Sequence, residues 1–599
     1  MEIGWSGKFK ELKEQKDKIV VTLVKHIEKN FEVSESQKNA WKDSINFLIE
    51  NLQDKYNDLY LGMEYTLPRM GGKRPDVILF FHNEIVILEF KMKEKYSKED
   101  ILQVIEYQES LKKYHEETWK RNYFVKSYLV LTKNFNDEIE EEYGVKILNN
   151  KSFFNSFIEN KSFMKELDVK SWIKSNYAPL PEVIEGAINL FKNNKLPDIK
   201  NIDDSVLMET EKTIKNLLNK RKGKKQVILV AGVPGSGKTL LGLKFNYFNN
   251  EKGISTIYIS GNGPLINILQ NELGQDKGLI TSILNYTNTY YNLNFSPREE
   301  VIIFDEAQRA WNEKEIKGNK LSEVAILLEI GNRIFLEKNS ATIIALVGFG
   351  QEIHNREEEG IKLWFKELEK DRYSDWSFYI PKNNIKLENK NICILDSLYI
   401  NTSIRSDFIN ITEFKNLFLN KKKETSEEKN KLKKSVEELY KKGYRLYWTK
   451  KLETVEKYLK CFQRKSGILG SSGVEEKKYK EIFHKNVKTH LTLNESYSWY
   501  KNRENTVVAT EFVVQGLDID YSLVVFGGDY YLENGEWKIS KMVKKKKLNI
   551  FLDSNKLFRN IYNVLLTRGR KGMLLYFPEE IGELKELVQR VKETGVIEK

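Results

Sequence analysis

The chain has few cysteines and no long apolar segment, and each shortage excludes a class of protein. Cys393 and Cys461 are the only cysteines among 599 residues, and they form no CxxC pair. This cysteine content argues against a disulfide framework and a zinc ribbon, and it fits a reducing compartment. No segment reaches the roughly 18 apolar residues of a membrane-spanning helix, and the polar start, Met1–Lys18, lacks a signal-peptide pattern. We expect a cytoplasmic protein without a membrane partner.

The composition is that of a globular protein with a basic excess. Charged residues make up 31% and hydrophobic residues 40%, which excludes a disordered chain. Lys and Arg total 98 against 86 Asp and Glu, for a net charge of +12. Such an excess suits a polyanionic partner, because Lys and Arg that neutralise phosphates release condensed counterions. A lysine-rich proteome would produce the same excess, so charge alone does not identify nucleic acid as the partner.

A glycine-rich loop between a strand and a helix predicts a phosphate-binding site. Residues 232–239 match G-x-x-x-x-G-K-[ST], directly after the apolar run Val227–Val230 and before a leucine-rich helix. The glycines allow backbone N–H groups to surround phosphates, Lys238 can reach the β- and γ-phosphates, and Thr239 offers a hydroxyl to Mg²⁺. A chance glycine-rich turn is the alternative. The predicted nucleotide-binding residues are Gly232, Pro234, Gly235, Ser236, Gly237, Lys238 and Thr239.

A second motif supplies the metal ligand and the general base for ATP hydrolysis. The apolar strand Val301–Phe304 ends in Asp305-Glu306-Ala307-Gln308, and Asp305 lies 67 residues after Lys238. Asp305 can hold the metal, and Glu306 can polarise the attacking water. A buried strand that ends in Asp-Glu by accident would not explain this order of motifs. We therefore predict an ATPase that uses ATP and Mg²⁺.

Three more residues could couple hydrolysis to the closure of two lobes. Gln351 follows the strand Leu346–Gly348, where a γ-phosphate sensor belongs. Arg405 stands at the start of the second lobe, and Arg568 is a candidate arginine finger near the end of the chain. Such a cation stabilises the transferring charge only when the lobes close on ATP. For either arginine alone, a surface salt bridge is the alternative.

Strands alternate with helices in two successive sets, which predicts two doubly wound parallel sheets. The first set comprises Gln226–Ala231, Thr256–Ser260, Glu300–Asp305 and Thr342–Gly348. The second set comprises Tyr444–Thr449, Gly467–Ser471, Thr506–Thr510, Tyr521–Gly527 and Met573–Phe577. Between the sets, Asn420–Lys442 predicts a solvated charged helix. The proline-containing break at 176–181 predicts a joint to a separate N-terminal module.

The N-terminal module carries a second group of chemically capable residues. Two apolar runs, Val77–Phe81 and Ile85–Phe90, predict a hairpin with Asp76 on its first strand and Glu89 on its second. Glu89 and Lys91 are two residues apart and share a face of that strand. Two carboxylates can bind Mg²⁺ or Mn²⁺, and a lysine can orient the attacking water. A surface ion pair between Glu89 and Lys91 is the alternative.

Residues 226–578 resemble the superfamily 1 helicases, and more narrowly the bacterial family related to the C-terminal helicase domain of Schlafen proteins. Besides the motifs above, the matching segments are Ile259–Leu265, Phe304–Trp311, Gly350–Ile353, Glu511–Asp518 and Leu565–Arg570. The resemblance implies two RecA-like domains, ATP-driven movement, and a single-strand track lined by Ser260–Pro264 and Gln515–Leu517. No adenine-reading glutamine motif precedes the phosphate loop, so the preference for ATP is inferred and not read from a motif.

The N-terminal module resembles the PD-(D/E)xK nuclease superfamily. Its hairpin matches the superfamily pattern, including Pro75 before the first acid. Gln103 and Tyr107 resemble the Q-x-x-x-Y motif of the RecB-like branch, and because they are four residues apart they share a helical face. The resemblance implies a metal-dependent nuclease in which Glu64, or failing that Glu50, supplies a further acid.

The combined hypothesis is an ATP-dependent helicase or translocase coupled to a metal-dependent nuclease. We expect an α/β protein with a nuclease-like module at 1–170, a linker at 171–204, and RecA-like domains at 205–400 and 401–599, the last with a helical insertion. The expected partner is nucleic acid, with single-stranded or forked DNA favoured and RNA left open. Fusions of this type are often linked to phage defence or DNA repair. Two alternatives stay open: a nucleic-acid sensor switched by ATP, and a front module that clamps nucleic acid without cutting it.

Overall fold

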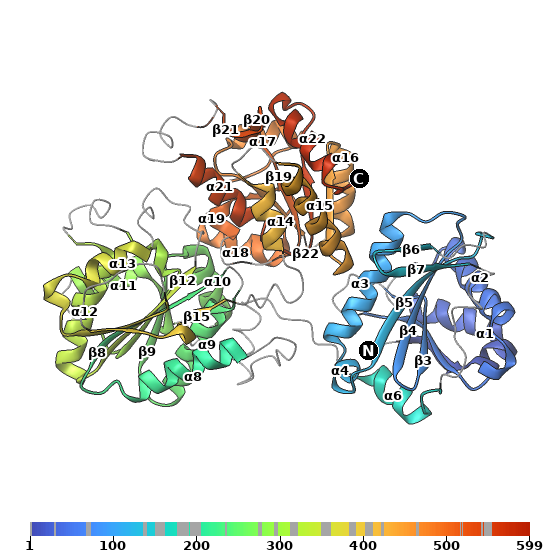
Figure 1. Ribbon diagram of the computed structural model, residues 1–599, viewed down its shortest axis with the longest axis horizontal. Helices are drawn as coiled ribbons and strands as arrows, with labels where there is room; N and C mark the ends of the chain where they lie inside the picture. The colour runs from blue at the N-terminus through green and yellow to red at the C-terminus, as the bar shows by residue number, and fades with distance from the viewer. Residues whose placement is uncertain are drawn as a thin grey trace. The chain divides into compact units, whose positions relative to one another are not determined.

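The structure is a computed structural model of the chain, and its described residues form two compact units (Figure 1). The units are 1–180 with 436–445, and 181–435 with 446–599. The first unit contains a seven-stranded sheet, and the second contains sheets of eight and six strands and a two-stranded ribbon. The described residues are 3–28, 32–67, 74–135, 140–149, 162–175, 191, 205–233, 236–273, 278–292, 297–311, 321–348, 361–382, 391–401, 411–420, 425–462, 466–514, 517, 519–540, 543 and 554–599.

The N-terminal sheet is mixed, with the strand order β1-β2-β3-β4-β5-β7-β6. The strands are β1 (Ile3–Lys8), β2 (Tyr60–Tyr65), β3 (Val77–Phe81), β4 (Glu84–Lys91), β5 (Phe124–Leu131), β6 (Glu140–Glu142) and β7 (Val145–Leu148). The helices are α1 (Phe9–Ile27), α2 (Glu35–Asn51), α3 (Lys98–Tyr114), α4 (Glu116–Lys120) and α6 (Glu166–Lys174). The pairs from β1 to β4 are antiparallel, whereas β4, β5 and β7 run parallel.

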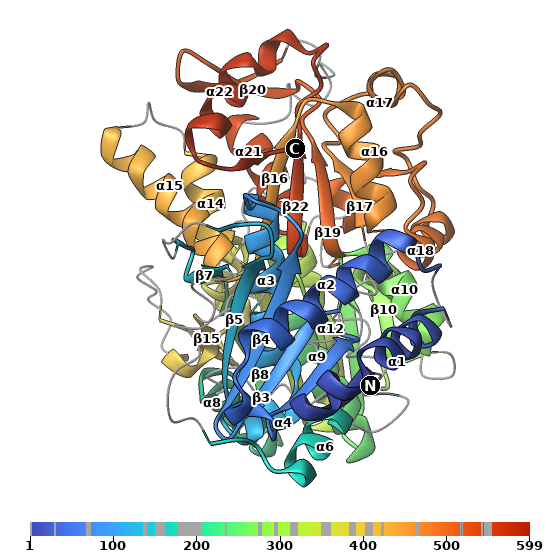
Figure 2. The same ribbon diagram turned by 90° about the vertical axis from the view of Figure 1, so that its right-hand side faces the viewer.

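Helices cover both faces of the N-terminal sheet, and successive residues of β3 pack on opposite sides. Val77 and Leu79 share a core with α1 and α2, while Ile78 and Phe80 share another with α3. Figure 1 shows α1 and α2 on one side of the sheet and α3 on the other, and Figure 2 shows α1 and α2 over β3 and β4. Because both faces are buried, these strands are continuous apolar runs and do not alternate with polar residues.

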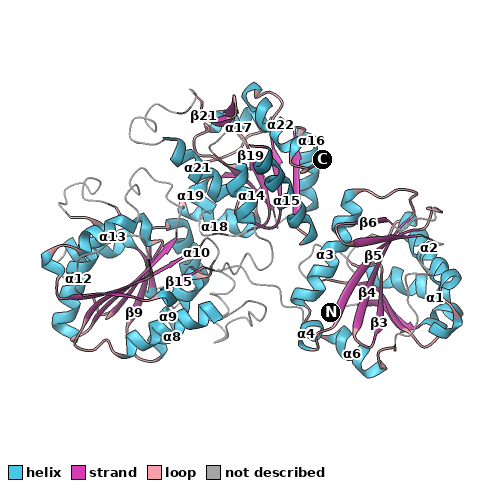
Figure 3. Ribbon diagram, in the orientation of Figure 1, coloured by secondary structure: helices cyan, strands magenta, loops and turns pink. Residues whose placement is uncertain are grey.

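The first sheet of the second unit is parallel, with the order β10-β9-β11-β12-β8-β13-β14, and β15 also pairs with β8. The strands are β8 (Lys225–Gly232), β9 (Thr256–Ser260), β10 (Ile280–Ser282), β11 (Val301–Asp305), β12 (Ala341–Gly348), β13 (Trp376–Ile380), β14 (Ile392–Ile394) and β15 (Tyr399–Ile400). The helices are α8 (Ser205–Asn219), α9 (Lys238–Glu251), α10 (Gly263–Leu273), α11 (Ile283–Thr287), α12 (Glu323–Lys338) and α13 (Ile361–Leu368). Figure 3 shows α12 and α13 on one side of this sheet and α8 and α9 on the other.

The second sheet of this unit has the order β18-β17-β19-β22-β16-β23, and β20 pairs with β21 as a ribbon. The strands are β16 (Arg445–Thr449), β17 (Ser466–Gly470), β18 (Val508–Ala509), β19 (Ile519–Val525), β20 (Tyr530–Glu533), β21 (Glu536–Ile539), β22 (Gly569–Tyr576) and β23 (Ile597–Glu598). The helices are α14 (Ile411–Phe418), α15 (Ser426–Lys441), α16 (Leu452–Cys461), α17 (Glu476–Phe483), α18 (Leu493–Asn502), α19 (Glu511–Val514), α21 (Ser554–Leu565) and α22 (Lys585–Glu593).

The parallel sheets predicted from the alternating strands and helices are confirmed. In the second sheet, β17 pairs in parallel with β18 and β19, and β19 with β22. The predicted strand Thr256–Ser260 coincides with β9, and α15 lies within the predicted charged stretch 420–442. Within the described ranges, no helix is both long and apolar enough to cross a membrane.

Candidate functional site

The phosphate loop lies where a buried strand meets a helix N-terminus. β8 ends at Gly232, and α9 begins at Lys238. Gly237, just before the helix, has a φ of +83°, a left-handed conformation that glycine adopts without strain. A Cβ on Gly232 would lie 2.9 Å from the carbonyl oxygen of Ile400, so this position also requires glycine. The N-terminal N–H groups and the positive dipole end of α9 therefore favour an anion at this loop.

The side chain of Lys238 is buried and turned back toward its own loop. Its Nζ donates hydrogen bonds to the carbonyl oxygens of Gly232 and Val233, both at 2.9 Å, and to Ser236 Oγ at 3.2 Å. Neutral oxygens bind an ammonium group less strongly than phosphate oxygens do. The phosphates of a nucleotide can therefore replace these oxygens as the acceptors of Lys238 Nζ. Pro234 and Gly235, which were also predicted to bind the nucleotide, lie outside the described residues.

Asp305, at the end of β11, is buried and shares one oxygen between two hydroxyl groups. Its Oδ2 accepts hydrogen bonds from Thr239 Oγ1 at 2.9 Å and from Tyr258 OH at 2.6 Å. Burial, together with the charge of Glu306, raises the pKa of Asp305 to about 6. A cation stabilises a buried carboxylate beside a second acid, and Mg²⁺ prefers oxygen ligands. Thr239 and Asp305 therefore fit a Mg²⁺ that accompanies ATP.

Glu306 is held in a buried turn with an unusual backbone conformation. Its φ of +56° is uncommon for a residue that has a side chain. Gln308 Nε2 donates a hydrogen bond to Glu306 Oε2 at 2.5 Å, and Gln308 Oε1 accepts one from the backbone N–H of Gly348 at 2.9 Å. The Glu306 carboxylate thus has a defined position directly after the predicted metal ligand, which suits a general base.

Tyr258 and Gln308 were not among the predicted site residues, although each has a signal in the sequence. Tyr258 is a hydroxyl-bearing residue in the apolar strand β9, and the sheet register places it beside Ile303 on β11. Gln308 belongs to the Asp-Glu-Ala-Gln motif, but its second partner, Gly348, is distant in sequence. The strand order and register that bring these residues together are not visible in the sequence.

The residues predicted to couple the two lobes are only partly described. Gln351 and Arg405 lie outside the described residues. Arg568 is only 2% exposed, and it donates hydrogen bonds to the carbonyl oxygens of Val564 at 3.0 Å and Leu517 at 3.3 Å. Both acceptors lie in the part of the chain that forms the six-stranded sheet and its helices, so Arg568 is packed inside its own predicted lobe in this structure. Its role as an arginine finger stays a prediction that requires release of the side chain.

Lys415 of α14 adds positive charge around Arg568. The side chain of Lys415 is also buried. Burial, and then the charges of Arg568 and Arg559, lower the pKa of Lys415 to about 8. Because like charges disfavour the protonated form, an anion bound near these three residues would relieve the repulsion.

Three acids are aligned across neighbouring strands of the N-terminal sheet. Met63 of β2 lies opposite Val77 of β3, which lies opposite Leu88 of β4. One residue further along these registers, Glu64 lies opposite Asp76, and Asp76 lies opposite Glu89. Burial and the charges of the other two acids raise the pKa of Asp76 well above its usual range. Carboxylates crowded in this way are stabilised by a divalent cation.

A lysine and two residues of α3 surround Glu89. Lys91 Nζ donates hydrogen bonds to Glu89 Oε1 at 2.8 Å and to Gln103 Oε1 at 3.3 Å. Gln103 Nε2 donates to Glu89 Oε1 at 2.7 Å and to Tyr107 OH at 2.8 Å. The structure therefore gathers the lysine, the glutamine and the tyrosine predicted from the motifs around Glu89, which stands beside Asp76.

The donor atoms of this N-terminal site fit a metal held by two carboxylates. Among the described residues, Glu89 Oε2 is buried and has no hydrogen-bond partner, an arrangement that a bound cation would satisfy. Glu64 is already engaged, since Trp41 Nε1 donates to its Oε1 at 2.8 Å and Arg74 Nε to its Oε2 at 2.5 Å. Among the residues that the structure describes, no three or more His, Cys, Asp or Glu side chains are arranged to hold a metal ion. Asp76 and Glu89 are therefore the two carboxylates that could hold a metal ion here, whereas Glu64 is engaged by Trp41 and Arg74.

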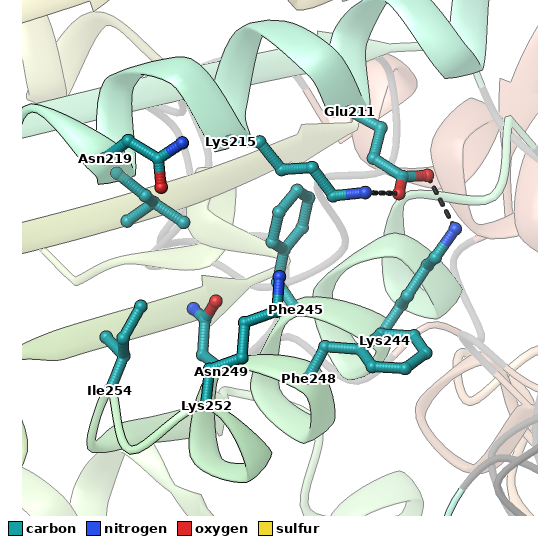
Figure 4. A pocket seen from close by; sticks show the side chains of 10 residues that line it. Glu211, Lys215, Asn219, Lys244, Phe245, Phe248, Asn249, Lys252 and Ile254 are labelled. Atoms are coloured by element: carbon teal, nitrogen blue, oxygen red, sulfur yellow. Dashed lines mark hydrogen bonds and ion pairs between the residues drawn. The ribbon is translucent and has the colours of Figure 1, made fainter.

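A pocket between α8 and α9 lies away from the phosphate loop. Phe245 and Phe248, in the second half of α9, line it, whereas the loop adjoins the first residue of that helix. Glu211 at its edge accepts hydrogen bonds from Lys215 and Lys244 (Figure 4). This pocket is therefore separate from the predicted nucleotide site.

Comparison with known protein families decides the assignment of the larger unit. Residues 225–579 match the family described as "Schlafen group 3, DNA/RNA helicase domain". The chain belongs to this family. The Schlafen group 3 match includes Lys238, Asp305, Glu306 and Arg568, and it excludes the acids of the N-terminal sheet. Residues 225–579 are therefore a nucleic-acid helicase domain with an ATPase site.

The solved structures that resemble this Schlafen group 3 helicase are distant. The Pif1 helicase from Candida albicans is 11% identical, with 64% of this chain and 98% of that chain covered and a TM-score of 0.28. Bacteroides sp Pif1 in complex with ADP-AlF4 is 10% identical, with 65% and 97% covered and a TM-score of 0.28. The DEAD-box helicase Mss116 bound to ssRNA and UDP-BeF is 12% identical, with 79% and 81% covered and a TM-score of 0.29. No curated protein matches the chain.

Proposed function

We propose that the chain is an ATP-dependent helicase or translocase whose motor serves a metal-dependent nuclease in residues 1–170. The observation that supports the nuclease is the proximity of Asp76, Glu89 and Lys91, together with one buried oxygen of Glu89 that has no hydrogen-bond partner among the described residues. Two carboxylates and a lysine at one end of a hairpin can hold a metal ion and orient a water for attack on phosphorus.

In the proposed motor, the residues of the first lobe bind and hydrolyse ATP. Lys238 and the N-terminus of α9 bind the phosphates. Thr239 and Asp305 hold Mg²⁺, which when bound neutralises charge on the β- and γ-phosphates. Glu306 orients the attacking water. The proposed sensors that couple hydrolysis to lobe closure are Gln351, Arg405 and Arg568.

In the proposed nuclease, some of the residues around Glu89 bind the metal ion and others orient the attacking water. Asp76 and Glu89 would hold Mg²⁺ or Mn²⁺, which when bound supplies Lewis acidity at the phosphate. Lys91 orients the attacking water from the same edge. Gln103 fixes both Glu89 and Lys91 through its hydrogen bonds, and Tyr107 fixes Gln103. The charge of the third acid, Glu64, adds to the repulsion that a bound cation would relieve at Asp76.

The proposed substrate is single-stranded or forked DNA, with RNA as the alternative polymer. The motor would track one strand and feed it to the nuclease, so that ATP hydrolysis controls which strand is cut. Such an enzyme would suit defence against phage or DNA repair. An ATP-switched sensor would also use the nucleotide site, but it would neither travel along a strand nor require the acids of the N-terminal sheet.

The decisive experiment measures cleavage, ATPase activity and unwinding by the full chain. The substrates are single-stranded, duplex and forked DNA and RNA, with Mg²⁺ or Mn²⁺. Lys238→Ala should abolish stimulated ATPase activity and unwinding, because it removes the phosphate-binding cation. Asp76→Ala and Lys91→Ala should abolish cleavage while ATPase activity persists.

A matched control separates the proposed chemistry from folding of the N-terminal module. Asp100→Asn weakens the first turn of α3, where Asp100 accepts from the backbone N–H of Ser97 at 2.9 Å, without touching Glu89. This variant should lose thermal stability but keep cleavage. Cleavage that survives in Asp76→Ala would refute the nuclease. No cleavage of any substrate by the wild-type chain would favour the clamp, and ATPase activity without unwinding would favour the sensor.

A further inference from the structure

Gln308 connects two parts of the first helicase lobe through the two ends of one amide group. Its side chain is fully buried, in the short 3₁₀ turn Ala307–Arg309 that follows β11. The Nε2 end donates to Glu306 Oε2 at 2.5 Å, and the Oε1 end accepts from the N–H of Gly348 at 2.9 Å. One side chain thus ties the predicted general base to the last residue of β12.

The primary amide of Gln308 satisfies both partners at once. The carboxylate of Glu306 requires a donor, and the N–H of Gly348 requires an acceptor. An apolar side chain of the same length would leave two buried polar groups without partners, and each such loss is costly. A glutamate at position 308 would lose the donor and place a second negative charge against Glu306.

The backbone at Glu306 has an unusual conformation that its neighbours must restrain. A residue with a side chain at a φ of +56° stays there only if its surroundings enforce the conformation. A second contact also restrains this turn, since Trp364 Nε1 of α13 donates to the carbonyl oxygen of Ala307 at 2.9 Å. Trp364 fixes the backbone of the turn, whereas Gln308 fixes the carboxylate itself.

We propose that Gln308 is a positioning residue for ATP hydrolysis. Its hydrogen bond to Oε2 of Glu306 orients the other carboxylate oxygen toward the attacking water. Because Gln308 is also bound to Gly348, this orientation depends on the position of β12. The inference rests on the proposed role of Glu306 in orienting water. It assigns no contact between Gln308 and the nucleotide, so ATP binding should be independent of this side chain.

The test replaces Gln308 with methionine, which has a similar length and no hydrogen-bonding amide. In Gln308→Met, kcat of the stimulated ATPase should fall by about 10- to 100-fold, the range expected when a reacting group is misplaced. The KM for ATP and the affinity for a fluorescent ATP analogue should stay within about two-fold, because the phosphate-binding residues are unchanged.

Gln226, at the start of β8, offers a matched control, because its partner Thr342 lies at the opposite end of β12 from Gly348. It is also buried, and its Nε2 donates to Thr342 Oγ1 of β12 at 3.0 Å. Gln226→Met removes an amide hydrogen bond from the same core, far from Glu306. A loss of thermal stability in both variants with a fall in kcat only in Gln308→Met is the expected result. An equal fall in kcat in both would show a merely structural role and overturn the proposal.

A double-mutant cycle distinguishes failure of this inference from failure of the proposed mechanism. If Gln308 acts through Glu306, Gln308→Met should not lower kcat further in a Glu306→Gln background. A further 10-fold loss there would overturn the positioning role. If Glu306→Gln alone keeps wild-type kcat, the proposed role of Glu306 fails, and the positioning role fails with it. If Glu306→Gln abolishes turnover while Gln308→Met does not change it, only the inference about Gln308 fails.

Discussion

The hydroxyl group of Tyr258 lies 2.6 Å from Asp305 Oδ2, the oxygen that Thr239 also contacts at 2.9 Å. The tyrosine belongs to β9 and the aspartate to β11, and these strands are neighbours in the sheet. Burial keeps Tyr258 protonated by raising its pKa well above the usual range, with the charge of Asp305 adding to the shift. Tyr258 is therefore a fixed hydrogen-bond donor that orients the proposed metal ligand.

We predict that Tyr258→Phe weakens the use of Mg²⁺ by the ATPase. Loss of a group that orients a metal ligand typically costs 10- to 100-fold in metal affinity or activity, so the Mg²⁺ concentration for half-maximal activity should rise by about 10-fold. Tyr286→Phe is the matched control, because the Tyr286 hydroxyl is buried in the same lobe and has no hydrogen-bond partner in the part of the chain that the structure describes. An unchanged Mg²⁺ dependence in Tyr258→Phe would contradict this role.

For the N-terminal site, we predict that Gln103→Ala strongly lowers the rate of cleavage and has only a small effect on the stability of the fold. Gln103 fixes Glu89 and Lys91, so its loss should reduce metal-dependent cleavage by roughly 10- to 100-fold. Gln108→Ala on the same helix removes a hydrogen bond with the hydroxyl of Ser127 instead. Cleavage rates measured over a range of Mn²⁺ concentrations compare the two. Equal rates in both variants would mean that the helix contributes packing and no orientation.

The sequence predicted the parts of the fold that are local, and it missed those that depend on distant pairing. The runs Val77–Phe81 and Thr256–Ser260 are apolar and β-branched, and both are strands with those bounds. The strand Tyr60–Tyr65 was missed because Gly62 and Glu64 lower its strand propensity. It exists because it pairs on both sides, with β1 and β3, and those pairings are set by tertiary structure.

The same limit applies to the candidate sites. Motif spacing predicts Lys238 at the start of a helix, because the strand, loop and helix that position it are contiguous, and it predicts Asp305 at the end of a strand of its own. Motif spacing could not reveal that Trp41 and Arg74 occupy the oxygens of Glu64, since those contacts join a helix, a strand and the segment before Asp76. Burial of a side chain such as Arg568 likewise depends on packing between elements far apart in the chain.

His115 makes the stability of the N-terminal unit depend on pH. The ring is fully buried, its Nε2 lies 3.0 Å from the carbonyl oxygen of Trp172, and its Nδ1 accepts from the N–H of Thr118 at 3.3 Å. A neutral ring with its proton on Nε2 donates to Trp172 and accepts from Thr118, whose Oγ1 also lies 2.8 Å from Nδ1. Burial accordingly lowers the pKa of His115 to about 3.

We predict that acid destabilises the N-terminal unit through this residue. The unfolded chain binds a proton near pH 6.5 and the folded chain only near pH 3, so the free energy of unfolding should fall by about 1.4 kcal/mol per pH unit between these values. Above pH 6.5 the effect is absent. Thermal unfolding from pH 7.5 to 4.5 should show this slope in the wild type and a smaller one in His115→Phe. His82→Gln, at an exposed histidine, should keep the wild-type slope, and an identical slope in His115→Phe would contradict the assignment.

Arg568 should matter for both stability and turnover, and a second arginine separates the two effects. Arg568→Ala leaves the carbonyl oxygens of Val564 and Leu517 without this donor, at a cost of about 1–3 kcal/mol in the free energy of unfolding. Arg590→Ala in the same lobe removes a similar contact, from Nη2 to the carbonyl oxygen of Leu417 at 2.9 Å. If Arg568 leaves its lobe to meet the γ-phosphate, stimulated ATPase activity should fall by about 10³-fold in Arg568→Ala alone. Strand separation should be lost with it. Equal ATPase rates in two equally destabilised variants would show that Arg568 remains a packing residue throughout the cycle.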